Sequence, residues 1–289
     1  MQGVILRAIS GFYTVSDGSI QMVCKPKGRF RYESLSPLVG DYVVVSEGDD
    51  GTGIIEEILP RRNSFIRPAV ANIELMIFVA SAVNPVTDPF LIDRVSVIAE
   101  NADCRFALCI NKCDLDRADS LYDIYRRTDY PIILASAENG EGVAEIKELM
   151  QGKISVLTGN SGVGKSSLLN KLMPELKIET DAVSIRLGRG KHTTRHVELY
   201  PLNNSTFAAD TPGFASFDVG MVGQIEKEHL DILFPEFRSC LGNCRFNDCR
   251  HLNEPGCAVL EQVCSGAVAP SRHASYARLY ELISSAKQY

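Results

Sequence analysis

Hydrophobic and polar positions follow three different patterns along the chain. Up to residue 65, short hydrophobic runs are separated by Gly and Asp turns and show no helical period. The runs predict strands at Val4–Ser16, Ile20–Cys24, Asp41–Val45 and Gly53–Leu59. Short strands at such close spacing are typical of a small β-barrel.

From residue 66 to residue 220, hydrophobic strands alternate with helical stretches. The predicted strands are Leu75–Val79, Phe106–Ile110, Ile132–Ala135 and Ile154–Leu157. The predicted helices are Pro89–Asn101, Ser120–Arg127, Gly142–Gln151 and Lys165–Leu172. This alternation indicates a parallel sheet with helices on its faces. Val197–Pro201 and Thr206–Asp210 predict an antiparallel hairpin after it.

The last part of the chain combines a cysteine cluster with helical stretches. Its final helix has an apolar stripe that includes Tyr276, Leu279 and Ile283. We therefore expect a multi-domain α/β protein, with a barrel at 1–65, a central domain at 66–220 and a C-terminal helical domain at 221–289.

Composition narrows the class of protein. Hydrophobic residues make up 45% and charged residues 23% of the 289 residues, as in an ordinary globular protein. The net charge of −6 argues against a uniformly basic nucleic-acid binder but allows a local basic patch. The N-terminus does not resemble a signal peptide. The longest apolar run, Leu75–Val83, has nine residues, whereas a membrane span needs about 20. We expect a soluble, cytoplasmic protein without a membrane partner.

A phosphate-binding loop is predicted after the strand Ile154–Leu157. Its sequence, GNSGVGKS, matches G-x-x-x-x-G-K-[ST]. Its glycines allow backbone N–H groups to surround phosphates, while Lys165 would reach the β- and γ-phosphates and Ser166 would bind Mg²⁺. The predicted nucleotide contacts here are Gly159, Asn160, Ser161, Gly162, Val163, Gly164, Lys165, Ser166 and Ser167.

A guanine-reading motif is predicted after the strand Phe106–Ile110. Asn111, Lys112, Cys113 and Asp114 form N-K-x-D. The Asp114 carboxylate can accept from N1–H and the 2-amino group of guanine, both of which adenine lacks. Lys112 would place its stem over the base, and a backbone N–H of Ser136-Ala137 would hold guanine O6. Taken alone, this short motif could equally be an ordinary turn at a strand end.

A third motif, D-x-x-G, spans residues 210–213. Asp210 would hold Mg²⁺ through water, and the N–H of Gly213 would meet the γ-phosphate. The order along the chain is base-reading motif, phosphate loop, D-x-x-G, whereas Ras-like GTPases have the phosphate loop first. A circular permutation explains this order, because strands can keep their places in a sheet while the chain ends move.

With these motifs the chain resembles the RsgA/YjeQ family, circularly permuted GTPases that depend on the small ribosomal subunit. The resemblance covers nearly the whole chain, and also includes an H-T-T segment, D-T-P-G-F and a Cys/His cluster. It implies an N-terminal OB-fold that contacts ribosomal RNA, a central P-loop GTPase domain and a C-terminal zinc-binding domain. It also implies hydrolysis of GTP to GDP and phosphate in late maturation of the small subunit, stimulated by that subunit.

The segment Lys191–Arg195 lies where the first switch of a GTPase belongs. Thr193 or Thr194 would coordinate Mg²⁺ and sense the γ-phosphate. Ras-like enzymes place a water-orienting Gln directly after D-x-x-G, but this chain has Phe214 there. His192 is the candidate catalytic residue, because similar proteins carry a His at this place. The alternative is that His192 contacts RNA or solvent.

Five of the nine cysteines fall between residues 240 and 264. An odd count, a tight cluster and no secretion signal favour a metal site over disulfides. The spacing C-x₄-C-x-H-x₅-C supplies four soft ligands, enough for a closed structural Zn²⁺ site. By residue type alone, Cys240 could replace Cys244. The family pattern implies one Zn²⁺ held by Cys244, Cys249, His251 and Cys257, beside the Mg²⁺ that accompanies GTP.

A basic segment in the barrel region is the candidate RNA contact. It contains Lys25, Lys27, Arg29, Phe30 and Arg31. Cations suit phosphates and aromatic rings can stack on unpaired bases, although a solvated basic hairpin has the same composition.

Two other functions fit part of the pattern: a GTP-dependent RNA-binding switch without an assembly role, and a zinc-stabilised RNA-binding module with a vestigial nucleotide site. The intact nucleotide-binding motifs argue against the module with a vestigial site. The order of the motifs separates the chain from ordinary translation factors. We expect a monomer whose partners are GTP or GDP and the small subunit with its rRNA.

Overall fold

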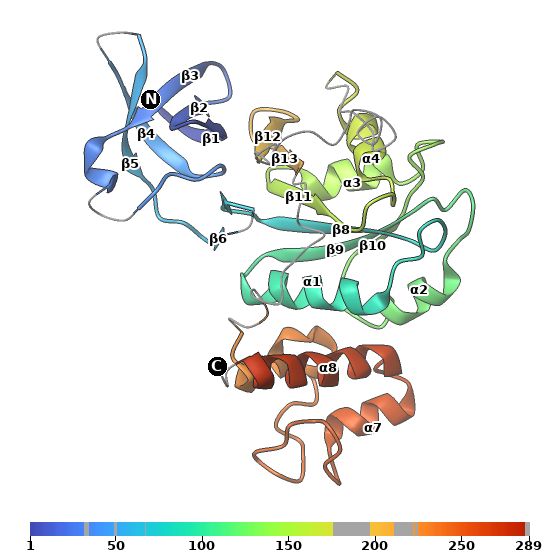
Figure 1. Ribbon diagram of the computed structural model, residues 1–289. Coiled ribbons are helices and arrows are strands. Elements are labelled where there is room, and N and C mark those ends of the chain that lie inside the picture. Colours follow the sequence, from blue (N-terminus) through green and yellow to red (C-terminus); the bar gives the residue numbers. More distant parts are fainter. Residues whose placement is uncertain are drawn as a thin grey trace.

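The N-terminal part is a closed five-stranded barrel. A computed structural model of the chain describes residues 1–31, 35–48, 51–66, 68–175, 197–210, 222 and 225–286. The barrel strands are β1 (Gln2–Ile9), β2 (Phe12–Ser16), β3 (Gln21–Pro26), β4 (Tyr42–Glu47) and β5 (Gly53–Ile58). They run in the order β1-β2-β3-β5-β4, and β4 pairs back to β1, which closes the barrel (Figure 1). This is the five-stranded OB-fold arrangement, so the predicted barrel is confirmed.

The predicted single strand Val4–Ser16 is wrong, because the chain turns in the middle of it. Ser10 and Gly11 adopt positive φ angles of 50° and 83°. Two consecutive positive φ angles are the geometry of a two-residue hairpin turn. The turn divides the hydrophobic run into β1 and β2, which pair in antiparallel fashion. The Ser-Gly pair was the sequence signal for this turn.

The central part is a six-stranded sheet in the order β10-β9-β8-β11-β13-β12. Five strands are parallel, and β12 is antiparallel to β13. Their bounds are β8 Leu75–Ser81, β9 Arg105–Asn111, β10 Ile132–Leu134, β11 Ile154–Thr158, β12 Glu198–Pro201 and β13 Phe207–Asp210. β12 also pairs with β1 of the barrel at Glu198 and Arg7. The short strands β6 (Ser64–Phe65) and β7 (Val70–Ala71) form a separate hairpin between barrel and sheet.

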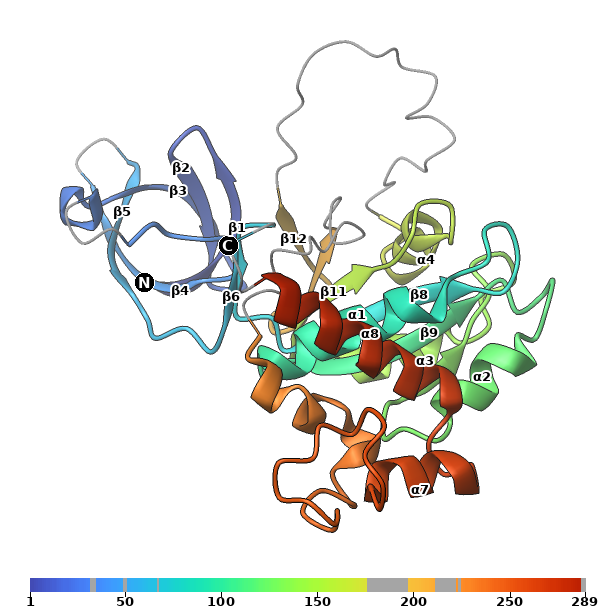
Figure 2. The ribbon, with the colours of Figure 1, turned by 60° about the horizontal axis from the view of Figure 1, so that its bottom comes forward.

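Helices cover both faces of the central sheet. Successive side chains of a strand point to opposite faces, and the strands are hydrophobic on both, so both faces have to be covered. In β8, Met76, Phe78 and Ala80 join the core shared with α1, whereas the intervening residues join the core shared with the other face. The helices are α1 (Pro89–Asn101), α2 (Asp119–Tyr125), α3 (Val143–Met150) and α4 (Lys165–Leu172). α1 and α2 lie on one face and α3 and α4 on the other (Figures 1 and 2). The bounds of α1 and α4 match the prediction.

The C-terminal part packs on the α1 side of the sheet. It comprises the 3₁₀ turns η3 (Lys227–His229), η4 (Asp231–Leu233) and η5 (Pro235–Phe237), followed by α7 (Ala258–Ser265) and α8 (Pro270–Ala286). α8 runs along α1 (Figure 2). Among the described residues, we find no helix that combines the length and the apolar character needed to cross a membrane.

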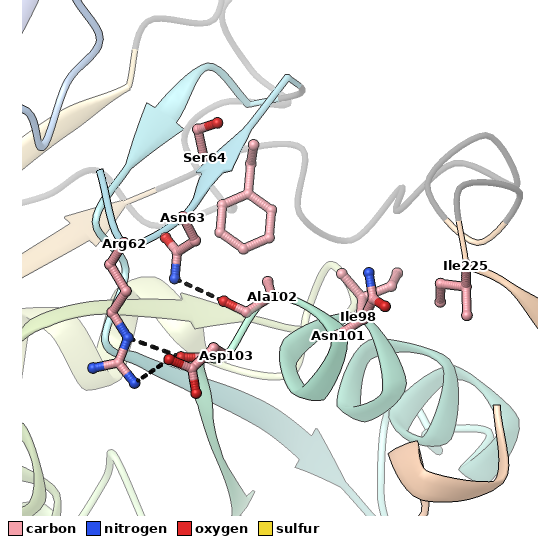
Figure 3. A pocket seen from close by; sticks show the side chains of 9 residues that line it. Arg62, Asn63, Ser64, Ile98, Asn101, Ala102, Asp103 and Ile225 are labelled. Atoms are coloured by element: carbon pink, nitrogen blue, oxygen red, sulfur yellow. Dashed lines mark hydrogen bonds and ion pairs between the residues drawn. The ribbon is translucent and has the colours of Figure 1, made fainter. Parts of the chain in front are cut away.

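A pocket of about 350 Å³ lies where the three parts meet (Figure 3). The amide of Asn63 donates to the Ala102 carbonyl at 3.0 Å, and Arg62 pairs with Asp103 at 2.8 Å. Ile225 from the C-terminal part completes the wall. These bonds fasten the segment after the barrel to the end of α1. Among the described residues, no site residue predicted from the sequence lines this pocket.

Candidate nucleotide site and metal centre

The predicted nucleotide residues meet at the carboxyl edge of the parallel sheet. The base-reading motif follows β9, Ser136-Ala137 follow β10, and the phosphate loop follows β11. Parallel strands deliver the loops after their carboxyl ends to one edge, where ligands bind in open α/β sheets. Residues 48 positions apart in the chain, Asn111 and Gly159, therefore flank the same site.

Asn111 joins three of these loops. Its buried amide donates to the Val163 carbonyl of the phosphate loop at 2.8 Å. Its carbonyl oxygen accepts from the N–H of Ala137 at 3.1 Å. Ala137 is one of the two residues predicted to supply an N–H for guanine O6, and here its N–H is bonded to Asn111. Asn111 thus holds the three loops together by hydrogen bonds. Asp114, by contrast, is exposed, so its carboxylate can accept hydrogen bonds from a base.

Two glycines of the phosphate loop are required by close contacts. A Cβ at Gly159 would lie 2.1 Å from the Val79 carbonyl oxygen, and one at Gly164 would lie 2.3 Å from the Asn111 amide nitrogen. Both residues also have positive φ, 139° and 95°, which glycine adopts without a Cβ penalty. The side chain of Lys165 donates to the carbonyls of Gly159 at 2.9 Å and Asn160 at 2.6 Å, so the loop is already folded around its lysine.

Several predicted residues lie outside the described part of the chain. They are His192, Thr193, Thr194 and Gly213, and only the backbone of Asp210 is described. That backbone ends β13 and pairs in register with Leu157 of β11, so residue 210 stands beside the strand that enters the phosphate loop. Ser166 lies in the first turn of α4. The magnesium ligands and the catalytic His192 stay predictions.

The predicted metal ligands converge. The side-chain ligand atoms of Cys244, Cys249, His251 and Cys257 all lie within 4.8 Å of one another. His251 Nδ1 is 3.5 Å from the Cys244 sulfur and 3.4 Å from the Cys257 sulfur. The alternative ligand Cys240 instead directs its thiol to the Phe237 carbonyl at 3.0 Å. Three sulfurs and one imidazole around one point fit a closed tetrahedral Zn²⁺ site.

A carboxylate behind the cluster orients its imidazole. Asp231 Oδ2 lies 3.5 Å from His251 Nε2, the nitrogen that faces away from the sulfurs. This contact raises the pKa of His251, with a smaller contribution from the nearby Cys257 and Cys244 sulfurs, against the opposing effect of burial. A carboxylate on the outer nitrogen is the usual support of a metal-binding histidine, because it leaves the inner nitrogen as the ligand. Asp231 was missed in the sequence, since it lies 20 positions before His251.

The four cysteines outside the C-terminal part show no sign of reactivity. Cys24, Cys104, Cys109 and Cys113 are buried, as expected for ordinary core thiols. Burial raises the pKa of Cys104 and of Cys109 to about 12, which keeps both protonated and unreactive. All nine cysteines lie in the described part of the chain, and of these only Cys264 is exposed.

The basic segment is only partly available to a ligand. Lys27 pairs with Glu56 at 2.5 Å, and Phe30 is 5% exposed, so its ring belongs to the barrel core. The side chains of Arg29 and Arg31 lie outside the described part. Lys25 is exposed and lies 5.5 Å from the centre of the Phe12 ring, which is 45% exposed. Among the described residues, Phe12 therefore places an exposed aromatic ring beside Lys25, whereas the sequence pattern pointed to Phe30.

Comparison with known proteins agrees with this architecture. The RsgA GTPase family profile matches residues 58–220, and the RsgA N-terminal domain profile matches residues 2–55. The chain is 40% identical to the small ribosomal subunit biogenesis GTPase RsgA of Ruminiclostridium cellulolyticum, over 99% of this chain and 95% of that protein. It is 41% identical to the protein of the same name from Caldanaerobacter subterraneus, over 96% and 94%.

Two solved structures share the fold. YjeQ from Thermotoga maritima superposes with a TM-score of 0.82 at 35% identity, covering 98% of each chain. YloQ, described as a circularly permuted GTPase, has the same TM-score and identity and covers 100% of this chain and 96% of its own. The predicted permuted order of the GTPase motifs is confirmed. The chain belongs to the RsgA family of GTPases.

Proposed function

We propose that this protein hydrolyses GTP to GDP and phosphate during late maturation of the small ribosomal subunit, and that the subunit stimulates the reaction. The observation that carries the proposal is the junction made by Asn111, which ties the base-reading motif to the phosphate loop. The names of the relatives, all small ribosomal subunit biogenesis GTPases, support the assignment of the substrate and the partner.

The predicted site residues would divide the work of binding. Asp114 would select guanine, and the backbone N–H groups of the phosphate loop would surround the phosphates. Lys165 would exchange its bonds to two loop carbonyls for the β- and γ-phosphate oxygens. Mg²⁺ held by Ser166, Asp210 and one of Thr193 and Thr194 would neutralise charge on the phosphates. We further propose that Gly213 meets the γ-phosphate and that His192 positions the attacking water.

The barrel would provide the contact with ribosomal RNA. Its surface offers a groove of about 430 Å³ lined by Phe12, Tyr13 and Lys25. An exposed ring beside a cation suits an unpaired base and its phosphate. We therefore place the RNA contact on Phe12 and Lys25, with Arg29 and Arg31 as further phosphate contacts. Lys27 contributes less, because Glu56 already neutralises it.

We infer that the Cys₃His cluster holds one structural Zn²⁺. The four ligands close the coordination shell, so the ion would stabilise the loop between η5 and α7 rather than take part in chemistry. The proposed boundaries of the three domains stay at residues 65/66 and 220/221. A role on the small subunit implies a cytoplasmic protein, and we propose that it acts as a monomer.

Guanine selection can be tested by changing Asp114 to Asn. The wild type should bind GTP far more tightly than ATP, and Asp114→Asn should weaken GTP binding by at least about 10²-fold, because a carboxylate that accepts two bonds is lost. XTP should restore binding, since its 2-oxo group accepts from the new amide. Dissociation constants for GTP, ATP and XTP, measured for both proteins, provide the readout. Equal affinity of the wild type for ATP and GTP would contradict the proposal.

Metal removal should expose a defined set of thiols. In native protein we expect a thiol reagent to label Cys264 alone, because the other cysteines are buried or bound to Zn²⁺. After chelation, Cys244, Cys249 and Cys257 should also react, with loss of one Zn²⁺ per chain and protons taken up by the freed ligands. Mass spectrometry of the labelled peptides and metal analysis check this. Labelling of Cys240 before the other three would contradict the assigned ligand set.

A further inference from the structure

The segment between β8 and α1, residues 82–88, lies against the base-reading motif. We call it the β8–α1 loop. The ammonium of Lys112 donates to the carbonyl of Asn84 in this loop and to the carbonyl of Gly162 in the phosphate loop, the latter at 2.8 Å. Lys112 is therefore held from two sides, by loops that are far apart in the sequence.

Two buried hydroxyl residues close the base of the β8–α1 loop. The N–H of Ser81 donates to Thr87 Oγ1 at 3.0 Å, and the N–H of Thr87 donates to the Ser81 carbonyl at 2.9 Å. The Ser81 hydroxyl donates to the Val83 carbonyl at 2.6 Å and accepts from the Val83 N–H at 3.1 Å. Ser81 and Thr87 are 0% and 2% exposed, so water does not replace these bonds. We call the two residues the hydroxyl clamp.

The loop also rests on the phosphate loop. A Cβ at Gly162 would lie 3.3 Å from Pro85 Cδ, so the two loops are in contact. Asn84 and Lys112 both have positive φ, 36° and 65°, which is uncommon for residues other than glycine. Such conformations persist where the surrounding structure holds them. The clamp on one side and the phosphate loop on the other supply that support.

We propose that Thr87 and Ser81 are positioning residues for guanine-nucleotide binding, because they hold the Asn84 carbonyl where it anchors Lys112. The inference rests on the proposed role of Lys112 in covering the base. A lysine side chain loses considerable rotamer freedom when its stem is fixed. With two carbonyl acceptors already in place, that freedom is lost before the nucleotide arrives. Without the clamp, binding would have to order both the loop and Lys112.

A double-mutant cycle on the full-length protein tests the inference. Dissociation constants for fluorescent GDP and ADP are measured for the wild type, Thr87→Val, Lys112→Met and the double variant, with Thr87→Ser as the control that keeps the hydroxyl. Thr87→Val removes the bond that Thr87 Oγ1 accepts from the Ser81 N–H. If the Lys112–Asn84 contact is lost with it, GDP binding should weaken about tenfold, as expected for loss of one bond to a charged group. Thr87→Ser should stay within about twofold of the wild type. In the Lys112→Met background, Thr87→Val should have almost no further effect, because coupled residues are not additive.

The outcomes separate this inference from the proposed function. If Thr87→Val weakens GDP binding by the same factor in the wild-type and Lys112→Met backgrounds, its role is merely structural and the inference is overturned. The same follows if Thr87→Val lowers the melting temperature but leaves the GDP affinity unchanged. If Thr87→Val does not fold, Ser81→Ala enters the same cycle. A wild type that binds ADP as tightly as GDP contradicts the proposed function instead. A clear preference for GDP with unaffected clamp variants contradicts this inference alone.

Discussion

Replacing His192 with Ala should lower GTP turnover in the presence of small ribosomal subunits by about 10²-fold, within the range for a positioned acid–base group. The position after D-x-x-G holds Phe214, whose ring cannot orient water, so another group must do so. Phosphoryl transfer depends on positioning and charge stabilisation. We therefore expect slow turnover by the protein alone and fast turnover when the small subunit is bound, with His192 supplying the positioned group.

GTP affinity should hardly change in His192→Ala, because His192 belongs to neither the phosphate loop nor the base-reading motif. His229→Ala serves as the matched control. His229 is an exposed residue of the C-terminal part, and among the described residues its ion-pair partner is Glu226. Steady-state turnover with and without subunits, together with GTP titrations, provides both readouts. Unchanged stimulated turnover in His192→Ala would exclude it as the catalytic residue. Fast turnover without subunits would refute the partner-dependent mechanism.

Replacing Arg272 with Ala should destabilise the protein by about 3–5 kcal/mol, the range for removing one partner of a buried ion pair. Arg272 of α8 is fully buried and bonds Asp93 of α1 at 2.8 Å and Glu236 of η5 at 2.6 Å. Its guanidinium also lies 4.6 Å from the centre of the Phe234 ring. The variant would leave the two buried carboxyl groups without their cation, where the C-terminal part packs against α1.

Arg278→Ala is the matched control on the same helix. Arg278 lies 3.8 Å from the centre of the Phe90 ring of α1, but it is exposed, so its loss should cost less than about 1 kcal/mol. Urea unfolding followed by fluorescence or circular dichroism measures both variants. Equal stability losses for the two would contradict the importance of the buried pair.

The loss in Arg272→Ala should also depend on pH. Burial already raises the pKa of Asp93 although Arg272 opposes it, and removing Arg272 should raise it further. A carboxyl group with a raised pKa binds more protons in the folded state than in the unfolded state, so stability falls as the pH rises through that range. The variant should therefore be closest to the wild type in acid and furthest from it near neutral pH. A loss that does not vary with pH would argue against an unpaired buried carboxyl.

Much of the nucleotide site could be predicted because each of its motifs is a short run of neighbouring residues. The phosphate loop depends on a local succession of strand, glycine turn and helix, and the helix Lys165–Leu172 has the predicted bounds. The N-K-x-D motif is equally local. The C-x₄-C-x-H-x₅-C spacing predicted a cluster for the same reason, because four ligands within 14 residues can close around one ion with little help from the rest of the fold.

What only the tertiary structure decided involves groups that are distant in the sequence or alike in composition. Phe12 and Phe30 are both aromatic residues near Lys25, and barrel closure alone determines that Phe30 is buried and Phe12 exposed. Asp231 approaches His251 only because η4 packs behind the cluster. Arg272 is one arginine among many in the sequence, and it becomes a buried link only because α8 docks on α1. Local patterns specify turns, motifs and helices, since their energies depend on neighbouring residues, whereas burial and pairing depend on which surfaces meet after the chain has folded.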